Sequence, residues 1–126
     1  MTTPEYALIE IHHVQIAMPP DEEDAGLRFY GELLGLERIP KPDALAPRGG
    51  LWFKLGQRQV HLGVEENDFH PAHKAHPAFV VSGLDALRTR LEEAGHRIDE
   101  DVQLEGYRRF HVRDPFGNRL ELIEPL

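Results

Sequence analysis

The first hydrophobic pattern along the chain is a run of apolar, mostly β-branched residues with a period near two. It covers residues 9–17, which predicts a strand, and two consecutive prolines end it. Asp21 then stands where it can cap a helix. Apolar side chains recur at helical spacing from Leu27 to Leu34, and Gly35 occupies the usual position of a C-terminal cap. The pattern therefore predicts a helix that begins near Asp21 and ends at Gly35.

The next stretch of sequence predicts three short strands. An apolar segment at residues 36–39 is followed by a long loop rich in proline and glycine. Residues 51–55 and 59–64 are two strand-like segments separated by a glycine-containing turn, which predicts a hairpin. Residues 66–74 are polar and show no periodicity, so we interpret them as a connector.

The same order of elements then begins again. Residues 75–81 predict a strand, and Ser82 to Asp85 match a capping box at the start of a helix. Leucines at helical spacing follow until Gly95, which ends this helix, and a short strand is expected near residues 96–98. The chain closes with a hairpin that turns at Asp114-Pro-Phe-Gly117, a sequence that suits a type I turn. The two strands of this hairpin are residues 107–113 and 118–123.

A constant offset relates the two halves of the chain. Gly35 corresponds to Gly95, 60 residues later, and His61 corresponds to Glu121 at the same offset. Internal repetition of this kind determines the architecture. We therefore predict an α+β fold in which one domain, residues 1–126, consists of two tandem βαβββ modules with one main helix each. The predicted modules cover about residues 7–65 and about residues 75–124, and residues 66–74 connect them.

Four residues at repeat-related positions carry side chains that can bind a metal: His13, His61, His76 and Glu121. His13 corresponds to His76, and each of the four lies on a predicted strand whose alternate residues are apolar. The chain has no cysteine, so nitrogen and oxygen are the only ligand atoms expected. Imidazoles with one carboxylate suit Fe(II), Mn, Ni, Co or Zn. The sequence thus predicts a divalent metal site where these strands converge.

The charge and hydropathy of the chain exclude several kinds of partner. The formal net charge is −8 and no basic stripe is present, so nucleic acid is excluded. No apolar run approaches the roughly 20 residues of a membrane span, so no membrane partner is expected. The first residues lack the basic start and apolar stretch of a signal peptide, and we therefore expect a cytoplasmic protein.

Four motifs, spread over essentially the whole chain, carry a family resemblance. They are His12-His-Val-Gln-Ile-Ala17, Phe29-Tyr-Gly-Glu-Leu-Leu-Gly-Leu36, His76 before Leu84-Asp85-Ala-Leu87, and Asp114-Pro-Phe-Gly-Asn-Arg-Leu-Glu-Leu-Ile-Glu124. With these motifs the chain resembles the vicinal oxygen chelate superfamily, which groups glyoxalase I, fosfomycin-modifying enzymes, bleomycin-resistance proteins and extradiol dioxygenases. The resemblance implies mixed sheets that curl around a central cup, with the helices outside.

The resemblance also implies a metal-dependent enzyme and a homodimer. Carried over position by position, the family's metal ligands fall on His13, His61, His76 and Glu121, although His61 stands where glyoxalase I-like members tend to have glutamate. The metal would bind two adjacent oxygens of a small, oxygen-rich substrate and stabilise an enolate, alkoxide or related anion. Glu121 would be the catalytic proton acceptor. Lyase or isomerase, dioxygenase and thiol-transfer chemistry all remain open.

The residues best placed to bind a substrate beside such a site are Arg48, Trp52, Lys74, Tyr107 and Arg109. As a group they predict an anion clamp with aromatic walls, whereas each one singly is also compatible with ordinary hairpin surface. His111 shares a predicted strand face with Arg109, where a pocket role and a structural role are both compatible. An alternative function is a non-catalytic protein of the bleomycin-resistance type, which sequesters a ligand in the same cup without metal.

Overall fold

The computed structural model describes residues 5–126, and the first half of them folds around a four-stranded mixed sheet. Its elements are strand β1 (His13–Met18), helix α1 (Glu23–Gly26), which continues as the π-helix η1 (Leu27–Leu33), β2 (Glu37–Ile39), the 3₁₀ turn η2 (Ala46–Arg48), β3 (Leu51–Leu55) and β4 (Arg58–Val64). The strand order is β1-β4-β3-β2, with β1 parallel to β4 and the other pairs antiparallel. This is the βαβββ module that the sequence predicts.

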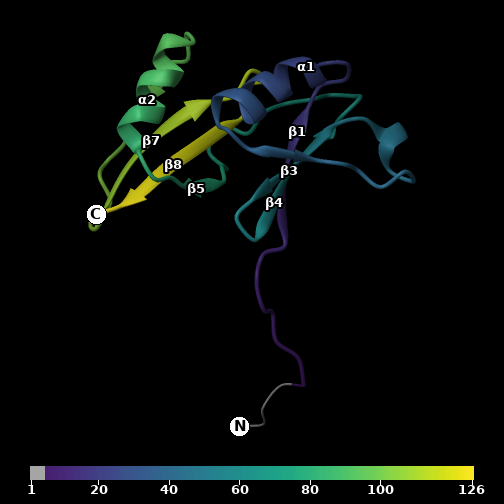
Figure 1. Cartoon of the computed structure of the whole chain (residues 1–126), viewed down its shortest axis with the longest axis horizontal. Helices are drawn as coiled ribbons and strands as arrows, with labels where there is room; N and C mark the ends of the chain where they lie inside the picture. The colour runs from purple at the N-terminus through teal and green to yellow at the C-terminus, as the bar shows by residue number, and fades with distance from the viewer. Residues whose placement is uncertain (1–4) are drawn as a thin grey trace.

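The second half of the chain repeats this topology. Its elements are β5 (Ala78–Val80), α2 (Leu84–Glu93), β6 (Ile98–Asp99), β7 (Tyr107–Arg113) and β8 (Arg119–Pro125), in the sheet order β5-β8-β7-β6. Figure 1 shows the two sheets beside one another, and no hydrogen-bonded ladder joins them within residues 5–126. The predicted α+β fold of two modules is therefore confirmed, and in the described part of the chain the two sheets do not close into one.

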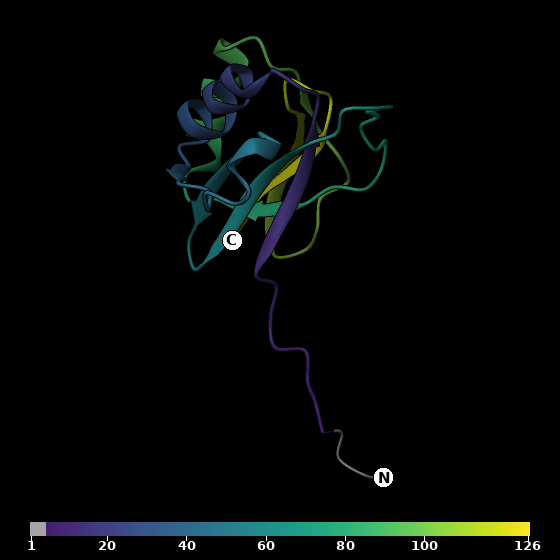
Figure 2. The ribbon, with the colours of Figure 1, turned by 90° about the vertical axis from the view of Figure 1, so that its right-hand side faces the viewer.

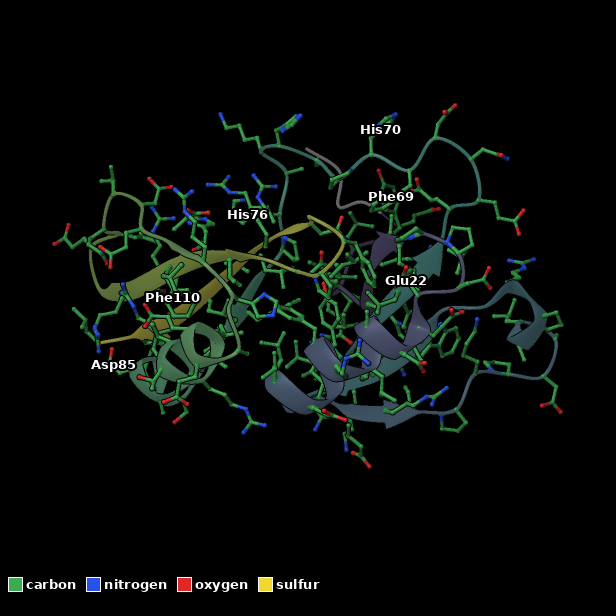
Figure 3. The ribbon with its side chains drawn as sticks, turned by 90° about the horizontal axis from the view of Figure 1, so that it is seen from above. Glu22, Phe69, His70, His76, Asp85 and Phe110 are labelled. Atoms are coloured by element: carbon green, nitrogen blue, oxygen red, sulfur yellow. The ribbon has the colours of Figure 1, made fainter. Side chains whose placement is uncertain are left out.

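The helices of both modules lie on the same side of the two sheets. In Figure 3, α1, η1 and α2 lie along one side, whereas His76 and the connector residues Phe69 and His70 lie on the other. Among the largest buried side chains are Phe29, Tyr30, Phe53 and Phe110, which belong to one continuous apolar core. None of the helices in the described residues combines the length and the hydrophobicity that a membrane crossing needs.

The first helix differs from the prediction in its turn and in its buried face. It has π geometry from Leu27 onward, and at its end Leu34 N donates a hydrogen bond to Phe29 O, five residues back, at 2.9 Å. The wider turn brings Phe29 as well as Tyr30 onto the buried face, with exposures of 1% and 0%. Leu27 and Leu34 are only partly buried. Gly35 has a φ of 77° and follows the helix end, as the sequence predicts.

The two helix N-termini are not capped as predicted. Asp21 has a φ of 62°, and the N-cap of α1 is Glu22, which makes no side-chain capping hydrogen bond. The capping box predicted at residues 82–85 is also wrong, because the N-cap of α2 is Gly83. Glu124 of β8 takes this role, since its carboxylate accepts hydrogen bonds from Gly83 N at 2.7 Å and from the next backbone N–H at 3.4 Å.

A buried hydrogen-bond network joins the two modules in the turn between β7 and β8. Asp114 is 4% exposed, and its Oδ2 accepts hydrogen bonds from the Tyr30 hydroxyl at 2.6 Å and from Asn118 Nδ2 at 2.8 Å. Its Oδ1 accepts hydrogen bonds from Phe116 N at 2.9 Å and Asn118 N at 2.8 Å. The Asn118 amide also donates to Ala17 O of β1 at 2.8 Å. One carboxylate therefore connects this turn to the first helix, and one amide connects it to the first strand.

The first strand begins later than predicted. Residues 9–12 lie outside β1, and Figures 1 and 2 show that the segment before β1 runs away from the rest of the chain. The exposed fractions of its apolar residues are 81% for Tyr6, 97% for Leu8, 83% for Ile9 and 67% for Ile11. An ion pair of 2.7 Å between Glu10 and Arg58 ties the segment to β4. The apolar side chains of residues 6–11 therefore do not pack on the described part of their own chain.

Candidate metal centre

His76 and Glu121 come from the parallel pair of strands β5 and β8. His76 lies two residues before β5, and Glu121 lies within β8, where it pairs with Ala78. Only 2.9 Å separates His76 Nε2 from Glu121 Oε1. The two candidate ligands of the second module are therefore in direct contact.

His111 joins this pair from the neighbouring strand. It is the partner of Glu121 in the β7–β8 ladder, and its Nε2 lies 3.2 Å from Glu121 Oε1. The ring centroids of His111 and His76 are 4.9 Å apart. One potential ligand atom from each of the three residues lies within 4.8 Å of the other two. Two imidazoles and one carboxylate thus meet on the sheet face opposite the helices.

The His111 side chain is buried without a hydrogen-bond partner. The residue is 2% exposed, and neither ring nitrogen has a partner within residues 5–126, because the approach to Glu121 lacks the geometry of a hydrogen bond. Leaving a buried polar group unpaired costs about 1–3 kcal/mol. A cation bound between His111 and its two neighbours would give one of these nitrogens a partner, and the residues present therefore fit a metal ion.

The two ring nitrogens of His76 both face oxygen acceptors. Nδ1 lies 2.8 Å from the backbone carbonyl of Lys74, and Nε2 lies 2.9 Å from the Glu121 carboxylate. A neutral imidazole has one N–H and donates to only one of them. Either a second proton on the ring or a cation at Nε2 removes the conflict. A backbone carbonyl that holds Nδ1 while Nε2 binds the ion is the usual support of a histidine ligand.

The spacing of the three side chains also suits a divalent ion. Ligand atoms about 2.1 Å from one ion, at angles between about 90° and 109°, lie about 3.0–3.4 Å from one another. The distances from Glu121 Oε1 to the two imidazole nitrogens are 2.9 Å and 3.2 Å. Two histidines with one carboxylate form a set that binds Fe(II), Zn and related divalent metals.

The charges around the centre favour an ionised Glu121 and a neutral His111. Burial raises the pKa of Glu121, but the hydrogen bond with His76 and the charge of Arg109 outweigh it, so the pKa lies below its ordinary value. The Arg109 guanidinium is 3.3 Å from Oε1. Burial lowers the pKa of His111, and the charge of Arg119 lowers it further. Near neutral pH the centre therefore offers the carboxylate and the unprotonated imidazole that metal binding requires.

His13 and His61 form a second pair on the first module. Their rings stack with centroids 4.2 Å apart, and the ring of Trp52 stacks on His61 at 4.0 Å. His61 is 4% exposed, and its Nε2 lies 2.8 Å from Gln59 Oε1. Burial and the neighbouring His13 lower the pKa of His61 to about 4, so its ring is neutral near pH 7.

The four predicted ligands lie in two pairs in this chain. Among residues 5–126, the only group of three or more potential ligands within reach of one another is His76, His111 and Glu121. His13 and His61 are not part of that group. The prediction that all four residues hold one ion stays a prediction, and it needs the second pair to come from a different arrangement of the modules or from another chain.

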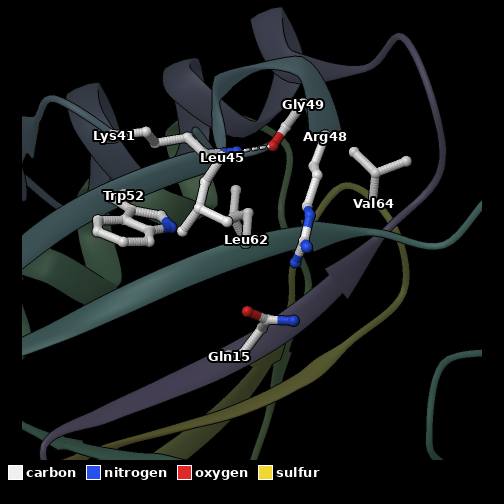
Figure 4. A pocket seen from close by; sticks show the side chains of 9 residues that line it. Gln15, Lys41, Leu45, Arg48, Gly49, Trp52, Leu62 and Val64 are labelled. Atoms are coloured by element: carbon white, nitrogen blue, oxygen red, sulfur yellow. Dashed lines mark hydrogen bonds between the residues drawn. The ribbon is translucent and has the colours of Figure 1, made fainter. Parts of the chain in front are cut away.

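The predicted substrate-binding residues are divided between several places. Arg48 and Trp52 line one pocket of about 230 Å³ on the first module (Figure 4). Arg109 lies beside the group of His76, His111 and Glu121, where it contacts Glu121 and donates from Nε to Val102 O at 3.1 Å. Tyr107 is 40% exposed, and Lys74 contributes its backbone carbonyl to His76. Their roles in binding, and the catalytic role of Glu121, stay predictions.

His111 is the member of the centre that the sequence leaves undecided. A signal exists in the alternation of the last hairpin: Phe110 and Val112 are apolar, as are Leu120 and Leu122, so His111 and Glu121 share the opposite face. The register depends on the length of the loop. The predicted turn at residues 114–117 forms, because Gly117 N donates to Asp114 O at 3.0 Å. Asp114 N also donates to Asn118 O at 2.9 Å, and in this register His111 lies directly opposite Glu121.

Comparisons with known proteins agree with this architecture. The family model of the Glyoxalase/Bleomycin resistance protein/Dioxygenase superfamily matches residues 10–122, and no curated protein sequence matches the chain. A solved glyoxalase family protein from Bacillus anthracis is 43% identical, with 98% of this chain and 100% of that chain covered and a TM-score of 0.91. A glyoxalase/dioxygenase from Nostoc punctiforme shares the fold at 22% identity, 98% and 99% coverage and a TM-score of 0.75. A lactoylglutathione lyase from Agrobacterium tumefaciens also shares the fold, at 24% identity and a TM-score of 0.63, with 98% of this chain and 96% of that chain covered.

Proposed function

The chain belongs to the Glyoxalase/Bleomycin resistance protein/Dioxygenase superfamily, and we propose that it is a divalent-metal-dependent enzyme of that superfamily which acts on a small, oxygen-rich substrate. One observation carries the proposal: a buried imidazole without a hydrogen-bond partner, His111, faces an ionised carboxylate and a second imidazole. Ligand sequestration of the bleomycin-resistance type does not need such a group. The metal-dependent function therefore explains more of this chain than the alternative does.

The residues around the centre supply binding and proton transfer. A divalent ion bound there would act as a Lewis acid on two adjacent substrate oxygens and stabilise negative charge on them. Glu121 Oε1 is the oxygen that His76, His111 and Arg109 approach, at 2.9, 3.2 and 3.3 Å. The other carboxylate oxygen, Oε2, makes no hydrogen bond within residues 5–126, and we assign to it the role of accepting a substrate proton.

Space for a small substrate lies next to His76. A pocket of about 270 Å³ between β1 and the connector has His76 and Arg119 in its wall. Arg119 donates to Lys74 O at 3.0 Å, which holds its guanidinium on the same side as the His76 ring. An arginine beside a Lewis-acid centre stabilises a substrate that is negatively charged or becomes so. This supports a small anionic substrate.

A second copy of the chain is the proposed source of His13 and His61. These two residues are stacked on one another but lie outside the group that contains Glu121. The segment before β1 leads directly into His13 and carries the exposed apolar side chains of residues 6–11. Exposed apolar surface of this kind is typical of a protein interface. We therefore propose a homodimer in which this segment packs on the partner and brings the two pairs of ligands together.

Calorimetric titration with Ni²⁺ or Mn²⁺ tests the metal proposal on tag-free protein stripped with a chelator. We expect one ion per chain in the parent protein. His111→Phe keeps a ring of similar shape but removes both nitrogens, and Glu121→Gln removes the charge. Each variant should bind at least tenfold more weakly, because each loses one of the ligands that His76, His111 and Glu121 supply.

The matched control is His73→Gln, an exposed histidine of the connector whose loss should leave the affinity unchanged. Circular dichroism melting confirms that each variant is folded. Less than one ion per chain in the parent protein, or unchanged affinity in both His111→Phe and Glu121→Gln, would contradict the proposal.

A further inference from the structure

One pocket of the first module combines positive charge with an aromatic wall. It has a volume of about 230 Å³ and lies between the loop that contains η2 and the sheet face that carries His61. Figure 4 shows that Arg48, Trp52 and Gln15 approach the same space from different sides, with Lys41 above it. These side chains come from β1, from β3 and from the loop between β2 and β3.

The charges in the pocket wall are all positive. Lys41 and Arg48 line it, and no aspartate or glutamate does, in a chain whose net charge is −8. Other arginines are neutralised, as Arg58 is by Glu10 and Arg108 by Asp85. Arg48, in contrast, has no ion-pair partner within residues 5–126. A concave wall with two cations and no acid attracts an anion.

The loop that carries Arg48 is held in place by the sheet beneath it. Gly50 has a φ of 85°, and its N–H donates to Glu23 Oε2 at 3.1 Å. A Cβ atom at Gly50 would lie 2.1 Å from Leu62 O, so only glycine permits this approach to β4. Lys41 Nζ donates to Gly49 O and braces the same loop. Arg48 therefore projects from a fixed backbone.

Trp52 and Gln15 complete the wall with a flat surface and a polar group. The Trp52 ring lines the pocket and also stacks on His61, with an interplanar angle of 3°. The Gln15 side chain lies over Gly63, where a Cβ atom would come within 2.4 Å of its Nε2. The absence of a side chain at Gly63 thus makes room for an amide that can donate hydrogen bonds to a ligand.

The pocket borders both parts of the proposed metal site. Trp52 connects it to His61 through the ring stack. Gln15 lines it and also lines the neighbouring pocket that has His76 in its wall. A molecule bound here therefore lies one side chain, Trp52, away from His61, and Gln15 stands between it and the pocket that has His76 in its wall.

We propose that this pocket binds the oxyanion group of a small organic anion, a carboxylate or a phosphonate, whose planar body lies against Trp52. The planar guanidinium of Arg48 matches two oxygens of such a group, and Lys41 adds a second positive charge. A pocket of about 230 Å³ limits the ligand to a small molecule. Identifying this anion as the substrate rests on the proposed function, but its binding needs no metal.

Fluorescence of Trp52, the single tryptophan of the chain, reports directly on the pocket. The chain is titrated in the presence of a chelator with benzoate, phenylphosphonate, inorganic phosphate and the neutral benzamide. We expect a saturable change of emission with benzoate or phenylphosphonate, and the better of the two identifies the oxyanion. Benzamide, which lacks the charge, and inorganic phosphate, which lacks the planar body, should bind at least tenfold more weakly than that ligand.

Two variants and one control locate the binding. Arg48→Gln and Lys41→Gln should each weaken it at least tenfold, whereas Arg38→Gln, an exposed arginine of β2 in the same module, should not change it. The inference is overturned if none of the three anions gives a saturable response, or if benzamide binds as tightly as they do. It is also overturned if Arg48→Gln and Lys41→Gln are both folded and bind the anion with unchanged affinity. The anion titration contains no metal, so the two proposals fail separately. If the parent protein binds a metal ion but none of the anions, this inference is refuted and the proposed function is not. If it binds an anion but no metal ion, the proposed function is refuted and this inference is not.

Discussion

Removal of one hydroxyl group tests how the two modules are held together. Tyr30→Phe keeps the ring, which is 0% exposed, and removes the hydrogen bond of 2.6 Å to Asp114. A hydrogen bond to a charged group contributes about 1.5–3 kcal/mol to stability. Asp114 retains its other three hydrogen bonds, at 2.8–2.9 Å, so it is not left unpaired. We therefore expect a loss in the lower part of that range, about 1.5–2 kcal/mol.

The effect of this substitution should also depend on pH. Burial, and then the negative charge of Asp114, raise the pKa of Tyr30 well above its usual value of 10.0. The folded protein keeps Tyr30 neutral, whereas the tyrosine of the unfolded chain ionises near pH 10. The unfolded state therefore gains stability as the pH rises above about 10, and the parent protein loses stability there. Tyr30→Phe lacks this contribution, so the difference in stability between the two proteins should shrink.

Urea unfolding followed by circular dichroism measures both effects, at pH 8 and at pH 10.5. Tyr107→Phe is the matched control, because Tyr107 is 40% exposed and its loss should change the stability by less than about 0.5 kcal/mol. A loss below about 0.5 kcal/mol for Tyr30→Phe at pH 8 would refute the role of this hydrogen bond. A difference that grows between pH 8 and pH 10.5 would refute the assignment of a neutral, buried Tyr30.

Two further predictions concern the loop of the anion pocket and the association of two chains. Gly50→Ala should lower the free energy of unfolding, measured in urea, by more than about 2 kcal/mol, because the new Cβ would lie 2.1 Å from Leu62 O. Gly56→Ala is the control: a Cβ there meets nothing within 4 Å, so the loss should be about 1 kcal/mol. An equal cost for the two variants would contradict this. The double variant Leu8→Glu with Ile11→Glu should halve the mass measured by light scattering, and Leu126→Glu, also highly exposed, should not. A parent protein that is already monomeric would contradict the homodimer.

Local chemistry explains why the repeat was predictable. Gly35 and Gly95 end the two helices with φ values of 77° and 89°, a conformation that glycine favours and that is visible in one sequence. The cap of α2 was not predictable, because Glu124 reaches it from a strand 40 residues away. The alternation of apolar residues from residue 9 onward also predicted too early a start for β1, which begins at His13. Such a pattern shows that a segment can be buried, but not whether the partner surface belongs to the same chain.

The sequence predicted which residues of each module form a pair of potential ligands, but not whether the two pairs meet at one site. The repeat identified Glu121, 60 residues after His61, and His76, 63 residues after His13, and the structure places His76 and Glu121 in contact. The position of the first module relative to the second follows from long-range contacts, such as that of Tyr30 with Asp114, which no repeat encodes. Whether His13 and His61 reach the same ion therefore could not be read from spacing. The sequence leaves the role of His111 open, because a histidine on the strand face of Arg109 fits a pocket role and a structural role equally, and the structure places it directly opposite Glu121.

The central claim is that His76, His111 and Glu121 hold a divalent metal ion. Anomalous diffraction at the zinc absorption edge, from crystals of tag-free protein grown with Zn²⁺, tests it most directly. We predict one anomalous peak per chain, about 2.0–2.2 Å from His76 Nε2, from a His111 ring nitrogen and from a Glu121 oxygen. Crystals that show no peak at these residues, or a peak bound to His76 and Glu121 that leaves His111 unbound, would contradict the claim.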